Sequence, residues 1–333
     1  MLNGKTVLIT GGTGSFGQRF TEIVLKRYTP KRLIVFSRDE LKQSEMHSRF
    51  GEDEYPNIRY FIGDVRDRER LHRAFDDVDV VVHAAALKQV LAAEYNPIEA
   101  VKTNVLGAAN VIDAAIDRGV TKVIALSTDK AASPISLYGA TKLCSDKLFV
   151  AANSYSGTHR TRFSVVRYGN VLGSRGSVIP LFQQLRITKR VPITDQRMTR
   201  FWITLDQGVE FVLNSLCRMS GGEIFIPKIP SMKLIDLARV ICPDCDMDIV
   251  GRRPGEKLHE LMVGEDDARN TLEYDDYYAI LPTVAYWNQE QKPDKDGGRL
   301  CPEGFRYSSE TNTQWLTVAE LEQIIGQSKL AAN

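Results

Sequence analysis

The sequence has no long apolar run, and this absence argues against a protein held in a membrane. The first apolar stretch of the 333 residues, TVLIT at 6–10, is only five residues long. No stretch approaches the ~20 apolar residues that a membrane-spanning helix needs. The first residues also lack the apolar core and cleavage pattern of a secretory signal. We therefore expect a cytoplasmic protein with no membrane partner.

The chain also lacks an excess of either charge. Lysine and arginine together number 43 and aspartate and glutamate 42, so the formal net charge is +1. A protein that binds nucleic acid or an acidic surface through its overall charge carries a clear basic excess. We therefore expect no nucleic-acid partner.

Cysteine is scarce and irregularly spaced. The five cysteines are an odd number in a long chain, which is not the pattern of a disulfide framework. CPDC at 242–245 is a Cys-x-x-Cys motif, but structural zinc needs a second pair of ligands and none follows at suitable spacing. The sequence predicts free thiols and no metal site.

Apolar strands alternate with amphipathic helices through the first half of the chain. Continuous apolar strands of this kind are typical of a parallel sheet covered by helices on both faces. The sequence therefore predicts an α/β fold with a doubly wound parallel Rossmann sheet and ligands at the carboxyl ends of its strands. The expected strands cover 5–10, 32–37, 58–64, 79–86, 122–128 and 163–169, and the expected helices cover 20–28, 40–50, 97–117 and 138–152.

The alternation breaks after Asn170, where glycine and proline interrupt the chain and the strands become short. We expect a cofactor-binding domain over 1–172 and a smaller, mainly substrate-binding C-terminal lobe over 173–330. One helix near 203–217 should return to the first domain. The segment 286–304 is predicted to be an exposed loop. A last helix should begin after Thr317, with Glu320 completing a capping box.

The first strand ends in a glycine-rich turn, TGGTGSFG at 10–17, that opens a helix. Gly11, Gly14 and Gly17 allow a tight turn and let a pyrophosphate approach the backbone. The N-terminus of the following helix favours an anion. In this position the motif predicts a dinucleotide site that also includes Thr13, Ser15 and Phe16.

The end of the second strand indicates which dinucleotide is bound. Enzymes that use NAD usually place an acid there to bind the ribose hydroxyls, but this strand ends with Ser37 and Arg38. Arg38, and Lys42 one helical turn later, are suited to a 2′-phosphate. The sequence therefore favours NADP, although the neighbouring Asp39 leaves NAD open. Asp64, with Val65 after it, follows the third strand and is predicted to lie near the adenine.

A tyrosine and a lysine follow the fifth strand at a spacing that places them on one helix face. Tyr138 and Lys142 are four residues apart. An ammonium near a phenol lowers its pKa and makes it a usable base. Thr128 ends the preceding strand and is placed to bond a substrate hydroxyl. The glycine-rich turn, this strand and the Tyr-x-x-x-Lys motif occur together here. Over its whole length, the chain resembles the extended short-chain dehydrogenase/reductase family.

That family includes sugar-nucleotide epimerases, reductases and dehydratases, and Asp129 and Lys130 separate these activities. A dehydratase oxidises carbon 4, after which the proton on carbon 5 is acidic and the hydroxyl on carbon 6 can leave. The chemistry needs a tyrosine base, an acid for the leaving hydroxyl and a base for carbon 5. Tyr138, Asp129 and Lys130 supply those groups. We expect the pKa of Asp129 to be raised and that of Lys130 to be lowered.

The chain is most similar to one subgroup of that family, the inverting 4,6-dehydratases of UDP-N-acetylglucosamine that open pseudaminic acid synthesis. Retaining enzymes usually have Thr-Asp-Glu where this chain has Thr-Asp-Lys. Matching stretches run from about residue 5 to about 320 and include TDKAASPISLYGATKLCSDKLF, SRDELKQSEM, HAAALK, AEYNP, VVRYGNV, GSRGSV, PITDQRMTRFWITL, GGEIFIPKIPSMK, RPGEKLHE and NTQWL.

The resemblance also implies roles for further residues and a homo-oligomer, with a hexamer as one candidate. Ala84, Ala85, Ala86 and Val171 should contact the cofactor, and Lys88 should lie near both cofactor and substrate. The residues implied to contact the UDP-sugar are Asn170, Val178, Thr194, Met198, Arg200, Arg253 and Glu256.

Two residues depart from the subgroup, and three other functions stay open. The subgroup reads ALKHVP where this chain reads ALKQVL, so Gln89 and Leu91 leave the exact sugar open. A UDP-sugar 4-epimerase would need neither Asp129 nor Lys130. A dinucleotide sensor would tend to lose Tyr138 or Lys142, and Lys130 argues against a retaining dehydratase.

Overall fold

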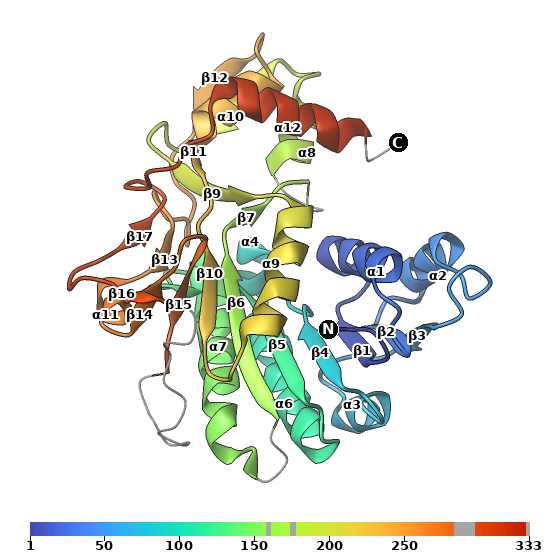
Figure 1. Ribbon diagram of the computed structural model, residues 1–333. Coiled ribbons are helices and arrows are strands. Elements are labelled where there is room, and N and C mark those ends of the chain that lie inside the picture. The colour runs from blue at the N-terminus through green and yellow to red at the C-terminus, as the bar shows by residue number, and fades with distance from the viewer. Residues whose placement is uncertain (158–160, 174–177, 283–296, 331–333) are drawn as a thin grey trace.

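The fold is built around a large, mostly parallel sheet with helices on both faces (Figure 1). The computed structural model describes residues 1–157, 161–173, 178–282 and 297–330. Within these ranges the central sheet has ten strands in the order β16-β14-β15-β10-β6-β5-β4-β1-β2-β3. The seven strands from β10 to β3 pair in parallel, and β14 to β16 extend that edge in antiparallel fashion. The α/β class and the doubly wound parallel sheet are thus confirmed.

The six strands that continuous apolar runs predicted correspond to β1 to β6, and the strands after them were not individually predicted. In chain order they are β1 (Thr6–Thr10), β2 (Arg32–Ser37), β3 (Ile58–Ile62), β4 (Val80–His83), β5 (Lys122–Thr128), β6 (Arg162–Tyr168), β7 (Asn170–Val171), β8 (Arg190–Ile193), β9 (Thr199–Ile203), β10 (Ile224–Pro227), β11 (Ser231–Lys233), β12 (Asp246–Ile249), β13 (Leu261–Val263), β14 (Thr271–Glu273), β15 (Tyr277–Ile280), β16 (Arg299–Leu300) and β17 (Tyr307–Ser308).

The helices cover both faces of this sheet. They are α1 (Ser15–Arg27), α2 (Glu40–Arg49), α3 (Arg68–Ala74), α4 (Val90–Tyr95), α5 (Pro97–Val101), α6 (Gly107–Asp117), α7 (Leu137–Tyr155), α8 (Val178–Leu185), α9 (Leu205–Arg218), α10 (Leu234–Ile241), α11 (Glu265–Ala268) and α12 (Val318–Leu330). Among the described residues, no helix is both long and apolar enough to cross a bilayer.

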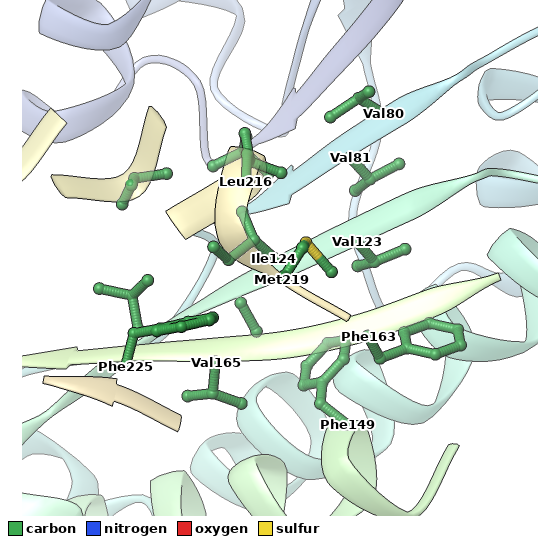
Figure 2. Packing of buried hydrophobic residues seen from close by; sticks show 14 of the residues in the cluster. Val80, Val81, Val123, Ile124, Phe149, Phe163, Val165, Leu216, Met219 and Phe225 are labelled. Carbon is green, nitrogen blue, oxygen red and sulfur yellow. The ribbon is translucent and has the colours of Figure 1, made fainter. Parts of the chain in front are cut away.

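The main core lies between the sheet and its helices. Figure 2 shows Leu216 and Met219 of the α9 region on one side of the central strands and Phe149 of α7 on the other. The strands between them contribute fully buried Val123, Phe163 and other apolar side chains. Burial on both faces explains why these strands read as continuous apolar runs.

A second apolar cluster forms a smaller lobe near the C-terminus. It joins α8, α10 and α12 through buried residues such as Phe182, Leu237 and Leu321. In Figure 1 these helices lie together, away from the central sheet. Strands β10 and β14 to β16 also come from the second half of the chain, yet they pair into the central sheet. The boundary between 172 and 173 stays a prediction.

The predicted returning helix corresponds to α9, which packs against α1 through ion pairs such as Arg19 with Asp206. The predicted capping box of the last helix is also present, because the Thr317 hydroxyl accepts from the Glu320 amide and the Glu320 carboxylate accepts from the Thr317 amide. Residues 286–296 of the predicted loop lie outside the described residues.

The predicted helix over 97–117 is not a uniform α-helix. Helices α5 and α6 are separated by a π-helical turn at Lys102–Leu106. Its Asn104 is buried, and its amide donates to the Leu87 carbonyl while its oxygen accepts from the Leu87 amide. The turn thus fixes the loop after β4 that leads to Lys88.

Candidate active site

The glycine-rich turn is packed so tightly that side chains are excluded from it. Gly11 has a φ of +64°, and a Cβ there would lie 2.8 Å from the Ala85 backbone. A Cβ on Gly17 would lie 2.3 Å from the Gly12 carbonyl oxygen. Helix α1 starts with no side-chain cap and no acidic residue in its first turn. Its first amides therefore remain suited to an anion, and the turn fits the pyrophosphate of a dinucleotide.

The two residues predicted to bind a 2′-phosphate, Arg38 and Lys42, follow the end of β2. Each lies beside an acidic residue. The Arg38 guanidinium is 3.7 Å from the Asp64 carboxylate, and the Lys42 ammonium bonds the Asp39 carboxylate. Asp39 also caps α2 through the Lys42 amide. Burial works against the charge of Asp64, but hydrogen bonds from Arg66 hold its pKa below the usual value. Ser37 is buried and bonds Thr13 and Gln43.

A cleft of about 700 Å³ lies at the carboxyl ends of the parallel strands and brings the cofactor turn and the catalytic stretch together. Most of the predicted residues line it. They are Thr13, Gly14, Ser15, Phe16, Gly17, Lys42, Ala84, Ala86, Lys88, Thr128, Lys130, Tyr138, Lys142, Asn170, Val171, Val178, Arg200, Arg253 and Glu256.

Nine predicted residues are not among the lining residues. They are Gly11, Ser37, Arg38, Asp64, Val65, Ala85, Asp129, Thr194 and Met198. Asp129 is fully buried beside Lys130, and Thr194 is buried with its hydroxyl 3.4 Å from the Met198 sulfur. Residues 174–177 of the GSRGSV motif lie outside the described residues.

Strand β5 ends at Thr128 and is followed directly by the predicted acid and base, Asp129 and Lys130. A 3₁₀ turn at Asp129–Ala131 follows, and the Thr128 hydroxyl accepts from the Lys130 amide. The Thr128 hydroxyl also donates to Asp129 Oδ1 at 3.0 Å. Lys130 Nζ is 3.0 Å from the same oxygen. Asp129 Oδ2 is buried and has no hydrogen-bond partner among the described residues.

Glu260 is the site residue that sequence reasoning missed. It is buried, and its Oε1 lies 3.2 Å from Lys130 Nζ and 3.6 Å from Arg200 Nε. Lys257 approaches its other oxygen at 4.0 Å. The RPGEKLHE motif contained Glu260, but only its tertiary contacts separate it from an ordinary charged residue. Other lining residues not predicted include Leu126, Ser127, Tyr168, Trp202, Leu205 and Gly255.

The pKa shifts confirm one expectation for the acid–base pair and contradict the other. Burial raises the pKa of Asp129, as expected of an acid, and the Glu260 charge adds to the effect while Lys130 opposes it. Burial works to lower the pKa of Lys130, but the Asp129 and Glu260 carboxylates outweigh it and hold that pKa above its usual value. The expected lowering for Lys130 is therefore wrong, because two anions surround it.

Tyr138 and Lys142 share one face of α7, and both are buried. Burial raises the pKa of Tyr138 to about 12, although Lys130 and a hydrogen bond with Thr128 act to lower it. The expected net lowering is therefore also wrong in this environment. The pKa of Lys142 is lowered by burial, against the attraction of Asp146. Its ammonium thus has less tendency to hold its proton than a solvated lysine.

The part of the cleft where a UDP-sugar is predicted to bind is lined mainly by residues of β7, β9 and the RPGEKLHE motif. Arg200 is held by the carbonyls of Thr199, Leu258 and Lys257, and its guanidinium lies 3.9 Å from the Glu256 carboxylate. Asn170 Oδ1 is buried without a partner among the described residues. Arg253 is exposed at the edge of the cleft.

The described residues contain no cluster of ligands that could hold a metal ion. All five cysteines are free, with Cys242 buried and Cys245 half-buried. The predicted free thiols are therefore confirmed.

Comparison with known proteins relates the chain to one family, and similar proteins and structures include the following. The polysaccharide biosynthesis protein family matches residues 7–282. A protein of Campylobacter jejuni named UDP-N-acetylglucosamine 4,6-dehydratase (inverting) is 56% identical, covering 99% of this chain and 99% of that protein. A UDP-glucose 4-epimerase of Rickettsia massiliae is 43% identical over 83% of this chain and 82% of its own. The X-ray structure of Pen from Bacillus thuringiensis superposes with a TM-score of 0.89 at 37% identity, covering 99% of both chains.

Proposed function

The chain belongs to the polysaccharide biosynthesis protein family of extended short-chain dehydrogenases/reductases, and from this premise we propose that it is an inverting UDP-N-acetylglucosamine 4,6-dehydratase. The observation that carries the proposal is the contact of the buried Asp129 with Lys130, which lines the same cleft as Tyr138. The product is UDP-2-acetamido-2,6-dideoxy-β-L-arabino-hex-4-ulose. We propose that this reaction is the first step in the synthesis of pseudaminic acid or a related surface sugar. We also propose that it takes place in the cytoplasm.

Oxidation at carbon 4 is the first task of the site. A dinucleotide held by the glycine-rich turn would supply the hydride chemistry that carbons 4 and 6 require. Tyr138 removes the proton of the hydroxyl on carbon 4 as the ketone forms. The charge of Lys130 and, less strongly, the Thr128 hydroxyl act to lower the pKa of the phenol and so favour its ionised form, although burial outweighs them. Lys142 lies on the same face of α7 and is placed to bind the cofactor ribose.

Elimination and epimerisation then use the pair on the 3₁₀ turn. The new ketone acidifies the proton on carbon 5, and Lys130 removes it. Asp129 protonates the hydroxyl on carbon 6, which leaves as water. Its raised pKa suits this role, because a carboxyl must still hold its proton near neutral pH to act as an acid. Lys130 then returns a proton to the opposite face of carbon 5, which inverts it.

A UDP-sugar 4-epimerase is the second candidate, since a curated epimerase shares 43% identity with the chain. Epimerisation at carbon 4 needs the tyrosine and the cofactor but no acid for carbon 6. In an epimerase, the buried Asp129 and its contact with Lys130 would have no role in the reaction. The greater identity to the dehydratase and this acid–base pair both favour dehydration.

We propose NADP as the cofactor because Arg38 and Lys42 stand at the end of β2. Arg38→Ala should weaken NADP binding about tenfold and leave NAD affinity nearly unchanged, since one exposed charge–phosphate contact is lost. Calorimetric titration with both dinucleotides measures this, with the exposed Lys26→Ala as control. Equal weakening of both cofactors would argue against a 2′-phosphate site here.

The substrate contacts and the assembly extend the proposal. Arg200 and Arg253 would bind the diphosphate, Glu256 the ribose of UDP, and Lys88 and Asn170 the sugar. Val178, Thr194 and Met198 would complete the UDP-sugar site. We also propose a homo-oligomer, because Leu91, Tyr95, Ile98 and Leu106 expose large apolar side chains along α4 to α6. Analytical ultracentrifugation of wild type and Tyr95→Glu tests whether this region holds subunits together.

A proton NMR time course tests the activity itself. The purified protein is mixed with UDP-N-acetylglucosamine in deuterated water without added cofactor. The proposal expects a new methyl signal and deuterium at an inverted carbon 5, and Lys130→Ala should abolish both. Conversion only to UDP-N-acetylgalactosamine would identify an epimerase. An unchanged substrate with the dinucleotide still bound would point to another sugar or to a sensor.

A further inference from the structure

The 3₁₀ turn that carries the proposed acid and base leads into strained backbone. Ser133, two residues after the turn, has a φ of +45°, in the left-handed region that residues with a side chain rarely adopt. Such strain persists only where the surroundings hold the backbone in place. The Lys130 carbonyl packs so closely on α7 that a Cβ on Gly139 would lie 2.2 Å from its oxygen. The shape of the turn therefore depends on contacts from other elements.

One of these contacts comes from a lysine that is distant in the sequence. Lys257 Nζ donates to the Ala132 carbonyl oxygen at 2.5 Å. The Lys257 side chain is 12% exposed, and its ammonium also lies 4.0 Å from Glu260 Oε2. Lys257 is not one of the described residues that line the cleft. It therefore holds the backbone that follows the acid and base without being placed to touch a sugar.

The same stretch of chain reaches the proposed nucleotide site. The Arg200 guanidinium donates to the carbonyls of Lys257 and Leu258. Glu256, the preceding residue, lines the cleft and lies 3.9 Å from that guanidinium. The backbone at Lys257 is thus fixed to an arginine that we propose binds the diphosphate. The Lys257 side chain extends this support to Ala132 at the end of the turn.

We propose that Lys257 is a positioning residue that holds Asp129 and Lys130 in place for elimination, an inference that rests on the proposed function. Oxidation at carbon 4 depends on Tyr138, which lies on α7 outside the turn. Displacement of a reacting group by about 1 Å can slow a reaction by on the order of 100-fold. Loss of the bond from Lys257 to Ala132 should therefore slow elimination and spare oxidation.

Lys257→Met tests this division, because methionine keeps the length of the side chain and removes the donor. A single turnover with UDP-N-acetylglucosamine is quenched rapidly and the 4-keto sugars are trapped with borodeuteride. Mass spectrometry then separates sugars that retain the hydroxyl on carbon 6 from 6-deoxy sugars. The variant should accumulate the keto sugar that retains this hydroxyl and form the 6-deoxy product at least about tenfold more slowly than wild type. Lys257→Arg, which keeps a donor, should restore much of that rate.

Hydrogen exchange gives a second measure that needs no turnover. The backbone amides of the turn should exchange at least about tenfold faster in Lys257→Met than in wild type. Lys228→Met is the matched control, because Lys228 is also mostly buried and pairs with Glu273, and neither residue lines the cleft. It should change neither exchange in the turn nor the trapped sugars. If Lys257→Met fails to fold, Lys257→Gln replaces it, because its shorter amide does not reach Ala132.

Three results would overturn the proposal. Oxidation and elimination slowed by the same factor would mean that Lys257 serves only the stability of the fold. A shifted pH profile with an unchanged maximum rate and unchanged exchange would mean that only its charge matters. Unchanged rates and exchange would mean that the turn needs no support from this lysine. Wild-type protein that forms no 4-keto product would instead refute the proposed function, and hydrogen exchange would still decide whether Lys257 holds the turn.

Discussion

At the scale of single residues, the surroundings of Lys130 determine when it can act as a base. Its ammonium lies within 3.2 Å of carboxylate oxygens from both Asp129 and Glu260. These anions hold the pKa of Lys130 above its usual value. A lysine must be neutral to act as a base. If Lys130 is that base, kcat/KM should therefore increase as pH rises. The Glu260 charge also raises the pKa of Asp129, which keeps the acid protonated to a higher pH.

Glu260→Gln should therefore move the whole pH profile of kcat/KM to lower pH. Loss of the anion lowers the pKa of Lys130, so the rising limb shifts down. It also lowers the pKa of Asp129, so the falling limb shifts the same way. A shift on the order of one pH unit is expected for a charge removed at this distance.

The exposed-surface variant Glu265→Gln serves as the control and should leave the pH profile in place. A Glu260→Gln enzyme with an unmoved profile and a lower rate at every pH would mean that Glu260 serves only the packing of the site.

Residue types were predictable in this site, but their charge states were not. One stretch of eleven residues contains Thr128, Asp129, Lys130 and Tyr138, so a single sequence motif identifies all four. Glu260 reaches Lys130 from 130 positions later, and no local pattern announces that contact. The pKa of Lys130 is therefore shifted up, whereas a downward shift was expected. Tyr138 differed for a related reason, since burial outweighs its neighbouring cation.

At the scale of elements, the turn between β1 and α1 has no room for side chains. Gly17→Ala would place a Cβ 2.3 Å from the Gly12 carbonyl oxygen. We expect a loss of about 2 kcal/mol in the free energy of unfolding and a clear loss of dinucleotide binding, because the backbone must shift. Thermal unfolding and cofactor titration measure both effects.

Gly208→Ala in α9 is the matched control. No atom lies within 4 Å of the added Cβ, so the helix should gain about 0.5 kcal/mol. Equal behaviour of the two variants would show that the turn adapts more easily than its packing indicates.

The π-helical turn makes a second prediction about an element. Asn104→Ala removes the side chain that bonds both backbone groups of Leu87 and the Thr141 hydroxyl. Stability should fall by about 3 kcal/mol, because buried polar groups lose their partners. The cofactor should also bind more weakly, since the loop that carries Ala86 and Lys88 loosens.

Asn110→Ala is the control for Asn104→Ala, because the Asn110 amide donates to the Val65 and Arg66 carbonyls, away from the loop after β4. It should lose about 1 kcal/mol. A similar loss of cofactor affinity in both variants would contradict a specific role for the π-helical turn.

The elements themselves were predictable to different degrees. Strands β1, β2, β4, β5 and β6 were found because burial on both faces makes them continuous apolar runs. The π-helical turn was missed because it follows from the contacts of Asn104 rather than from helix periodicity. Strands such as β7 and β16 contain two residues each, which is too short for any alternation to appear. Their pairing partners are distant in the sequence.

At the scale of the whole molecule, the site joins two separately packed clusters. Tyr138 on α7 and the glycine-rich turn after β1 lie on the side of the central sheet, while Arg200 and Arg253 come from the segment that also packs the smaller lobe. A ligand that contacts both parts should stabilise the fold as a unit. UDP at 100 times its dissociation constant should add about 2.7 kcal/mol to the free energy of unfolding.

Hydrogen exchange and thermal unfolding with and without UDP check this coupling. Protection should appear both in 199–203 and in 253–260. Arg253→Ala should reduce the UDP-dependent gain and leave the unfolding temperature without UDP unchanged. Protection confined to the cofactor turn would place the nucleotide elsewhere.

The contacts of Arg200 have a consequence for the evolution of such enzymes. One guanidinium lies 3.9 Å from Glu256, which we propose binds the nucleotide, and 3.6 Å from Glu260, which contacts the proposed base Lys130. A lineage that alters this arginine to accept another nucleotide also alters the electrical surroundings of Lys130. Nucleotide specificity and the pH dependence of activity are therefore coupled through this arginine. A substitution that changes one during evolution also changes the other.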